Sequence, residues 1–173
     1  MKRVDYFNAI RDGMLWRIPL KKGDPDTTCN GKHIILLQLL RSDPDIEIIK
    51  PQVCDFSWTR LFDENPNLPR GILRDLVEDE DSHLYLKANI RGRYIALDCT
   101  WDRGLQGYLP VNEWDGSNAT KIAVHPLRIY TEEESLRSFF EEPLQLAQED
   151  YTGKNINFYR AMNDFVDRAR RQK

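Results

Sequence analysis

The fold of this chain is decided by residues 83–101, which read HLYLKANIRGRYIALDCTW. Apolar side chains occupy every second position of residues 83–90, which is the period of a half-buried β-strand. Residues 93–100 predict a second strand, and Arg91 and Gly92 predict the turn between the two. The stretch therefore predicts a β-hairpin.

The register of this hairpin places a histidine and an aspartate on one face. With a two-residue loop, paired positions sum to 183, so that Asp98 lies opposite Tyr85. His83 and Asp98 are then diagonal neighbours, about 7–8 Å apart at the backbone. A carboxylate in an apolar strand is costly to bury without a partner, and we expect His83 to be that partner. A loop with an odd number of residues would place the two on opposite faces.

A helix is expected to begin near Cys29, after a Gly- and Pro-containing loop at residues 21–26 and capping candidates ending at Thr28. Apolar residues run almost all round residues 29–41, which is typical of a buried helix. Free N–H groups and the helix dipole at its N-terminus stabilise a thiolate, so Cys29 is a candidate nucleophile. The alternative is a cysteine that acts as a small buried hydrophobe.

Three histidines are candidate bases for such a nucleophile. His33 shares a helix face with Cys29 but is expected to point along the core, and His125 reads as a surface or turn residue. His83 has an acidic partner in Asp98. These residues predict a triad in which Cys29 attacks, His83 transfers the proton and Asp98 orients the imidazole.

The remaining elements complete an α+β prediction. Strands are expected at residues 46–50, 52–59, 108–114 and 121–124, a loop at 61–69, and helices at 5–18, after Thr131 and at 155–171. The last helix carries an apolar face and is expected to cap the core. The predicted architecture is a central nucleophile helix packed on an antiparallel sheet, with a C-terminal capping helix.

Composition excludes several classes of protein. The chain has 173 residues, 40% of them hydrophobic and 31% charged, which is typical of one globular domain. With 25 Lys and Arg against 28 Asp and Glu, the net charge is −3, and no nucleic-acid partner is expected.

The longest apolar run, residues 34–37, is too short to span a membrane, and the N-terminus does not read as a signal peptide. We therefore expect a cytoplasmic protein without a membrane partner, and leave its oligomeric state open.

The cysteine pattern argues against structural sulfur sites. Cys29, Cys54 and Cys99 are odd in number and form no CxxC pair, so neither a disulfide framework nor a zinc knuckle fits. Cys54 and Cys99 are expected to be packing residues. No calcium-loop motif is present, and neither a metal nor another cofactor is expected.

The order and spacing of the three candidate residues resemble the transglutaminase-like superfamily of cysteine protease-like proteins. The likeness rests on Thr28-Cys29 opening a helix, on His83 starting a strand 54 residues later, and on the ending Asp98-Cys99-Thr100-Trp101. It covers roughly residues 20–105. The resemblance implies a papain/transglutaminase-like core over about 20–130 in a single domain 1–173, with a helical extension at about 131–173. It also implies thiol acyl transfer on amide bonds of a protein or peptide substrate, by hydrolysis or transamidation.

Further residues are candidates for the walls of the site. We expect Tyr85, Trp101 and Trp58 to contact substrate, although Trp101 fits a core position equally well. Trp58 or Trp16 has an indole N–H suited to an oxyanion, but the backbone N–H of Cys29 is the preferred donor. The acidic run at residues 78–81 is expected to be solvated and to favour a charged His83.

An alternative function from another class stays open. The same fold can serve as a binding or structural module in which the triad is catalytically silent.

Overall fold

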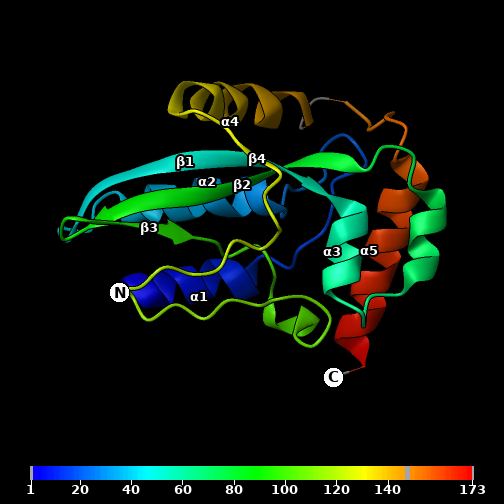
Figure 1. The fold of residues 1–173 in the computed structure, drawn as a ribbon, viewed down its shortest axis with the longest axis horizontal. Coiled ribbons are helices and arrows are strands. Elements are labelled where there is room, and N and C mark those ends of the chain that lie inside the picture. Colours follow the sequence, from blue (N-terminus) through cyan, green and yellow to red (C-terminus); the bar gives the residue numbers. More distant parts are fainter. Residues whose placement is uncertain (1, 147–148, 173) are drawn as a thin grey trace.

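A four-stranded antiparallel sheet is the centre of the computed structural model, which describes residues 2–146 and 149–172 (Figure 1). The strand order is β3-β2-β1-β4. The bounds are β1 Ile46–Ser57, β2 Glu80–Ile90, β3 Arg93–Leu97 and β4 Arg128–Ile129. With the helices around it, this sheet makes the chain an α+β protein, as predicted.

The β2–β3 hairpin has the predicted register. Leu86 lies opposite Leu97, and both residues of the two-residue loop have positive φ, 50° at Arg91 and 78° at Gly92. Positive φ at both loop positions is the signature of the tight turn that matches the twist of the strands it connects. Glycine adopts this conformation without strain, and the turn thereby fixes which residues face each other.

Strand β3 ends at Leu97, earlier than the predicted end at Thr100. The Asp98 amide donates to the Thr120 hydroxyl at 2.8 Å, and the Thr100 amide donates to the Asp98 carboxylate at 3.0 Å. Side chains therefore replace the neighbouring strand as hydrogen-bond partners, and the chain leaves the sheet.

Strand β1 is continuous through Pro51, where two separate runs were expected. Pro51 lies opposite Leu86 of β2, and β4 pairs with β1 only at Cys54 and Asp55. At Pro51 the other edge of β1 has no strand partner, so a residue without an N–H costs no ladder hydrogen bond there.

Helices cover the sheet and one of its ends (Figure 1). Their bounds are α1 Arg3–Gly13, α2 Cys29–Leu40, α3 Trp58–Glu64, α4 Glu132–Leu146 and α5 Ile156–Arg171, with 3₁₀ helices η1 Arg70–Asp75 and η2 Arg103–Leu105. Helix α2 packs on β2 and β1, α1 packs on α2, and α4 packs on β1. Helices α3 and α5 stand together at one end of the sheet (Figure 1).

Two expectations about local structure are wrong. Helix α3 occupies part of the expected loop at residues 61–69, because Ser57 caps it by accepting from the Arg60 amide and because its apolar side chains are buried. Residues 108–114 and 121–124 are irregular rather than strands.

The apolar faces of α2 and α5 differ in how well they were predicted. Leu36 and Leu40 are buried, but Ile35 and Leu39 are 37% and 36% exposed, so α2 is buried on one face and not all round. Helix α5 buries the predicted face. It packs against η1 and η2 and caps that end of the core.

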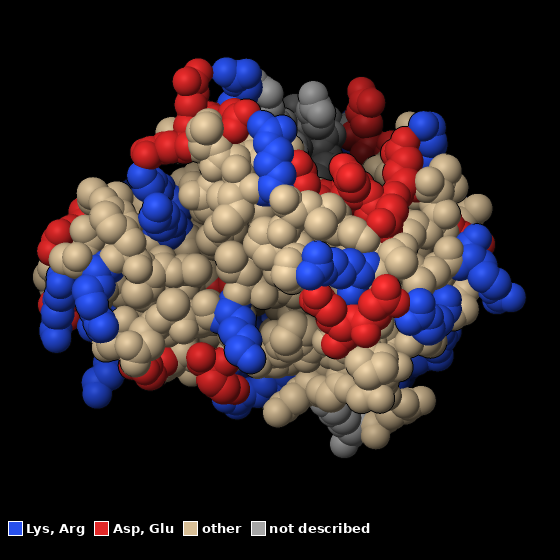
Figure 2. Space-filling model, in the orientation of Figure 1, with Lys and Arg blue, Asp and Glu red and all other residues tan. Residues whose placement is uncertain are grey.

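The surface carries mixed charge. Lys and Arg side chains are interspersed with Asp and Glu on the face shown in Figure 2. None of the helices in the described residues is both long and apolar enough to cross a membrane.

A close approach at Gly31 fixes the loop that leads into α2. A Cβ on Gly31 would lie 1.8 Å from the Asp26 carbonyl oxygen. The loop therefore crosses the first turn of α2 at a distance that only glycine permits.

We predict that Gly31→Ala lowers the free energy of unfolding by about 1–3 kcal/mol, because the loop or the helix must shift. Urea denaturation measures the loss. Gly13→Ala is the control, since nothing lies within 4 Å of a Cβ at Gly13. Equal stability of the two variants would contradict the close approach.

Candidate active site

A cleft of about 300 Å³ lies where the N-terminus of α2 meets β1, β2 and α5. Cys29 and His83 both line it. Six aromatic side chains line it, those of Trp16, Phe56, Trp58, Trp101, Tyr151 and Tyr159.

Cys29 is the first residue of α2 and is partly exposed. The side chain of the preceding residue, Thr28, makes no capping bond to the helix, and its hydroxyl donates to Asp26 at 2.6 Å. The amides of a first helical turn have no partner within the helix. The N-terminus of α2 therefore presents the Cys29 sulfur and uncapped N–H groups at the cleft.

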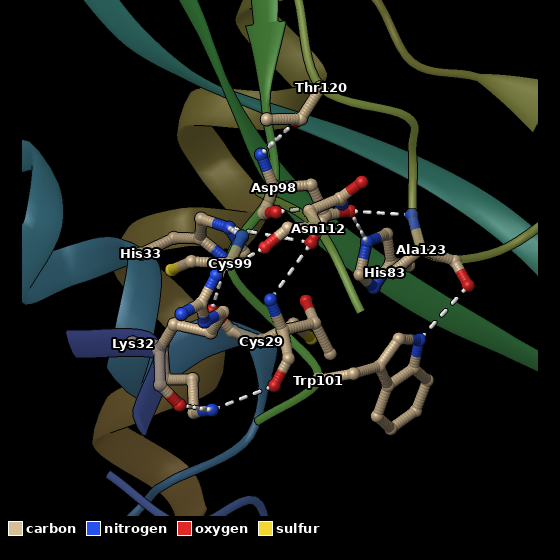
Figure 3. A network of polar contacts seen from close by, with 12 residues as sticks. Cys29, Lys32, His33, His83, Asp98, Cys99, Trp101, Asn112, Thr120 and Ala123 are labelled. Carbon is tan, nitrogen blue, oxygen red and sulfur yellow. Dashed lines mark hydrogen bonds and ion pairs between the residues drawn. The ribbon is translucent and has the colours of Figure 1, made fainter. Parts of the chain in front are cut away.

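His83 and Asp98 form the predicted pair (Figure 3). The His83 Nε2 lies 2.7 Å from the Asp98 Oδ2, and the two side chains are 3% and 0% exposed. Asp98 also accepts hydrogen bonds from the amides of Ala123 and Thr100, at 2.8 and 3.0 Å. The carboxylate is thus fully engaged and fixes the plane of the imidazole.

The environment of this pair favours its charged form. Burial alone would lower the pKa of His83, but the charge and hydrogen bond of Asp98, with a further contribution from the Cys29 side chain, raise it to about 10. Burial would raise the pKa of Asp98, but the His83 charge and hydrogen bond hold it well below its usual range. An imidazolium is therefore expected beside Cys29 at neutral pH.

His33 is a structural link, as its predicted position along the core suggested. Its Nδ1–H donates to the Cys29 carbonyl at 2.7 Å, and its Nε2 accepts from the Cys99 amide at 3.0 Å. Burial lowers the pKa of His33 to about 4, so the ring is neutral at pH 7. His125 is exposed and pairs with Glu64 at 3.4 Å, away from the cleft.

Lys32 is a second link, and sequence reasoning missed it. This side chain is fully buried, and its Nζ donates to the carbonyls of Arg11 and Thr100 at 2.9 and 2.8 Å (Figure 3). Burial lowers the pKa of Lys32 to about 8. A lone lysine in an apolar helix was the available signal. With His33, it ties the Cys29 end of α2 to the turn that carries Asp98.

The tryptophans proposed to contact substrate do line the cleft, with their indole N–H groups already bound. Trp58 donates to Asp81 at 3.1 Å, and Trp101 donates to the Ala123 carbonyl at 3.1 Å. Trp58 therefore does not supply an oxyanion donor, and the Cys29 amide remains the preferred one.

Tyr85 is not on the cleft wall. It is 5% exposed and stacks beside His83 with ring centres 6.3 Å apart, but it belongs to the core behind the cleft. A substrate in the cleft would not contact Tyr85, so the structure does not support its predicted role.

The two other cysteines are packing residues, as expected. Cys54 and Cys99 are 0% and 1% exposed. Burial raises the pKa of the Cys54 thiol to about 12 and raises that of Cys99 as well.

The acidic run at residues 78–81 is bound by protein groups rather than merely solvated. Glu78 pairs with Lys154 at 2.6 Å, and Asp79 accepts from the Ser57 hydroxyl and the Thr59 amide. The groups that raise the pKa of His83 most are Asp98 and Cys29, so the run is not among the main causes of that shift.

Thr100 adds an unused hydroxyl to the site, and sequence reasoning did not single it out. It lines the cleft and is 2% exposed, yet its Oγ1 has no hydrogen-bond partner among the described residues. Buried polar atoms are nearly always paired, so this hydroxyl is suited to a polar group of a ligand.

Comparisons with protein-family models, curated proteins and solved structures found no match to this chain. Within the described residues, no group of three or more His, Cys, Asp or Glu side chains is placed to hold a metal ion.

We predict that Asp98→Asn lowers the pKa of His83 markedly from about 10, because burial is then opposed only by the Cys29 side chain. Ring chemical shifts followed by NMR against pH measure the change. Asp98 also acts on His33, whose ring should stay neutral down to about pH 4 in both proteins. An unchanged His83 titration in the variant would refute the assigned cause.

Proposed function

We propose that the protein is a thiol acyl-transfer enzyme that acts on amide bonds through Cys29, His83 and Asp98. One observation carries the proposal. The Cys29 thiol opens a helix in the same cleft as His83, whose other side is hydrogen-bonded to a buried carboxylate.

The chemistry follows from this arrangement. Because Nε2 of His83 is held by Asp98, Nδ1 is the nitrogen left to exchange a proton with Cys29. The Cys29 thiolate attacks the amide carbonyl carbon, and the His83 imidazolium protonates the leaving amine as the C–N bond breaks. The thioester is then resolved by water or by an amine, whose proton His83 accepts. The N–H groups at the start of α2 stabilise the negative oxygen of each tetrahedral intermediate.

The fold supports a more specific form of the proposal. A helix led by cysteine, packed on an antiparallel sheet whose hairpin supplies histidine and then aspartate, is the arrangement that the sequence resemblance implies. We therefore propose a papain/transglutaminase-like core and a protein or peptide substrate. The steps above require no cofactor.

Alkylation tests whether Cys29 is an activated nucleophile. An ordinary thiol with a pKa of about 8.5 is almost wholly protonated at pH 6, so a thiolate there reacts on the order of 100-fold faster. We predict that iodoacetamide labels Cys29 in the native protein at pH 6 well ahead of Cys54 and Cys99, as read by peptide mass spectrometry. His83→Gln should remove most of this advantage.

Labelling of Cys29 no faster than that of an ordinary exposed thiol at pH 6, and unchanged in His83→Gln, would instead support the catalytically silent binding module. Labelling in denaturant provides the control, since all three thiols are then exposed and equivalent.

Acyl transfer itself is tested with 4-nitrophenyl acetate. We predict a burst of nitrophenol that approaches one equivalent per protein, with acetylation confined to Cys29. Cys29→Ala should abolish the burst, while Cys54→Ala should retain it. A burst that survives Cys29→Ala would exclude Cys29 as the acyl carrier.

A further inference from the structure

Asp81 places a carboxylate in the cleft beside His83. The two residues are separated by one position of β2, so their side chains share a strand face about 7 Å apart. Across the sheet, Asp81 is paired with Phe56, and both residues line the cleft.

Neutral groups hold this carboxylate. Its Oδ2 accepts from Trp58 Nε1 at 3.1 Å and from the Tyr159 hydroxyl at 2.7 Å, and its Oδ1 accepts from the Ser82 amide at 2.8 Å. Within the part of the chain that the structure describes, Asp81 forms no ion pair with a Lys or Arg side chain. Its negative charge is therefore oriented but not neutralised by another side chain.

The aromatic rings around Asp81 also favour the binding of a positively charged group in the cleft. Trp58 packs edge-to-face on Phe56 with ring centroids 4.9 Å apart, and the ring centroids of Tyr159 and Tyr151 are 5.1 Å apart. Aromatic faces carry partial negative charge and attract cations by about 0.5–2 kcal/mol. Among the described residues, no Lys or Arg lines the cleft, and the His83 imidazolium, which does line it, is paired with the Asp98 carboxylate at 2.7 Å.

We propose that the cleft recognises a positively charged group of the substrate, an alkylammonium or guanidinium, which sits among these rings against Asp81. The inference rests on the proposed function for its meaning, because the cation is part of the molecule whose amide meets Cys29. It names the substrate class. The competing explanation is that Asp81 only holds Trp58 and Tyr159 in place, which an uncharged acceptor would also do.

Choline and its neutral isostere 3,3-dimethylbutan-1-ol test the preference for charge on the unaltered protein. Both are titrated at low ionic strength while tryptophan fluorescence and the rate of Cys29 alkylation by iodoacetamide are followed. We expect choline to change the fluorescence and protect Cys29 at a roughly tenfold lower concentration than the alcohol. Equal concentrations would overturn the proposal.

Three variants assign the effect to Asp81. Asp81→Asn should abolish the difference between choline and the alcohol, whereas Asp81→Glu should preserve it. Glu80→Gln is the matched control, because it removes the same charge from an exposed neighbouring position, and it should leave the difference intact.

Folding of each variant is checked by circular dichroism. If Asp81→Asn does not fold, the outcome is decided by the unaltered protein together with Asp81→Glu, and loss of the choline preference in Asp81→Glu would count against the assignment.

Two substrate pairs distinguish the side of the amide on which the cation lies. For the acyl side, benzoyl-arginine 4-nitroanilide is compared with its citrulline analogue. For the amine side, 1,5-diaminopentane is compared with pentylamine as the group that resolves the acetyl thioester. A preference of about tenfold for the charged member of one pair, lost in Asp81→Asn, is expected, and no preference in either pair would overturn the substrate class.

Failure of this inference is distinguishable from failure of the proposed function. Fluorescence reports choline binding whether or not Cys29 reacts. A selective burst at Cys29 without any preference for choline would retain the enzyme and remove the cation site.

Discussion

The burial of the Asp98 carboxylate is the constraint on which the rest of the structure depends. A buried anion is tolerated only when charges and hydrogen bonds replace its water. His83 supplies the charge, and the amides of Thr100 and Ala123 supply the remaining bonds. Because the Thr100 amide turns back to Asp98, the chain leaves β3. Because the Ala123 amide also binds Asp98, the irregular segment around Ala123 lies against the hairpin. The same demands align the imidazole with the end of α2.

The parts of this arrangement that were predictable from sequence are those that local chemistry determines. The two-residue turn at Arg91 and Gly92 sets the hairpin register, and the register places His83 near Asp98. The loop before Cys29 indicates where α2 begins. The end of β3 was not predictable, because it depends on the Thr120 hydroxyl, which is distant in sequence.

The remaining features of the site arise from packing between elements far apart in the chain. Lys32 is visible in the sequence as a lone lysine in an apolar helix, but its partners, the carbonyls of Arg11 and Thr100, are not. Trp58 was a possible oxyanion donor besides the preferred Cys29 amide, and only the fold shows that its indole N–H is bound to Asp81. Periodicity and capping patterns carry no information about such contacts, because each depends on where another element comes to rest.

Helix α5 has a consequence for the order in which the protein is assembled. Cys29, His83 and Asp98 all precede it in the chain and are synthesised first, yet Tyr159 of α5 completes the cleft wall and binds Asp81. A nascent chain therefore contains the Cys29 thiol before it contains the tyrosine that completes the cleft wall. The cleft therefore has its full wall, and Asp81 its Tyr159 partner, only after α5 has docked.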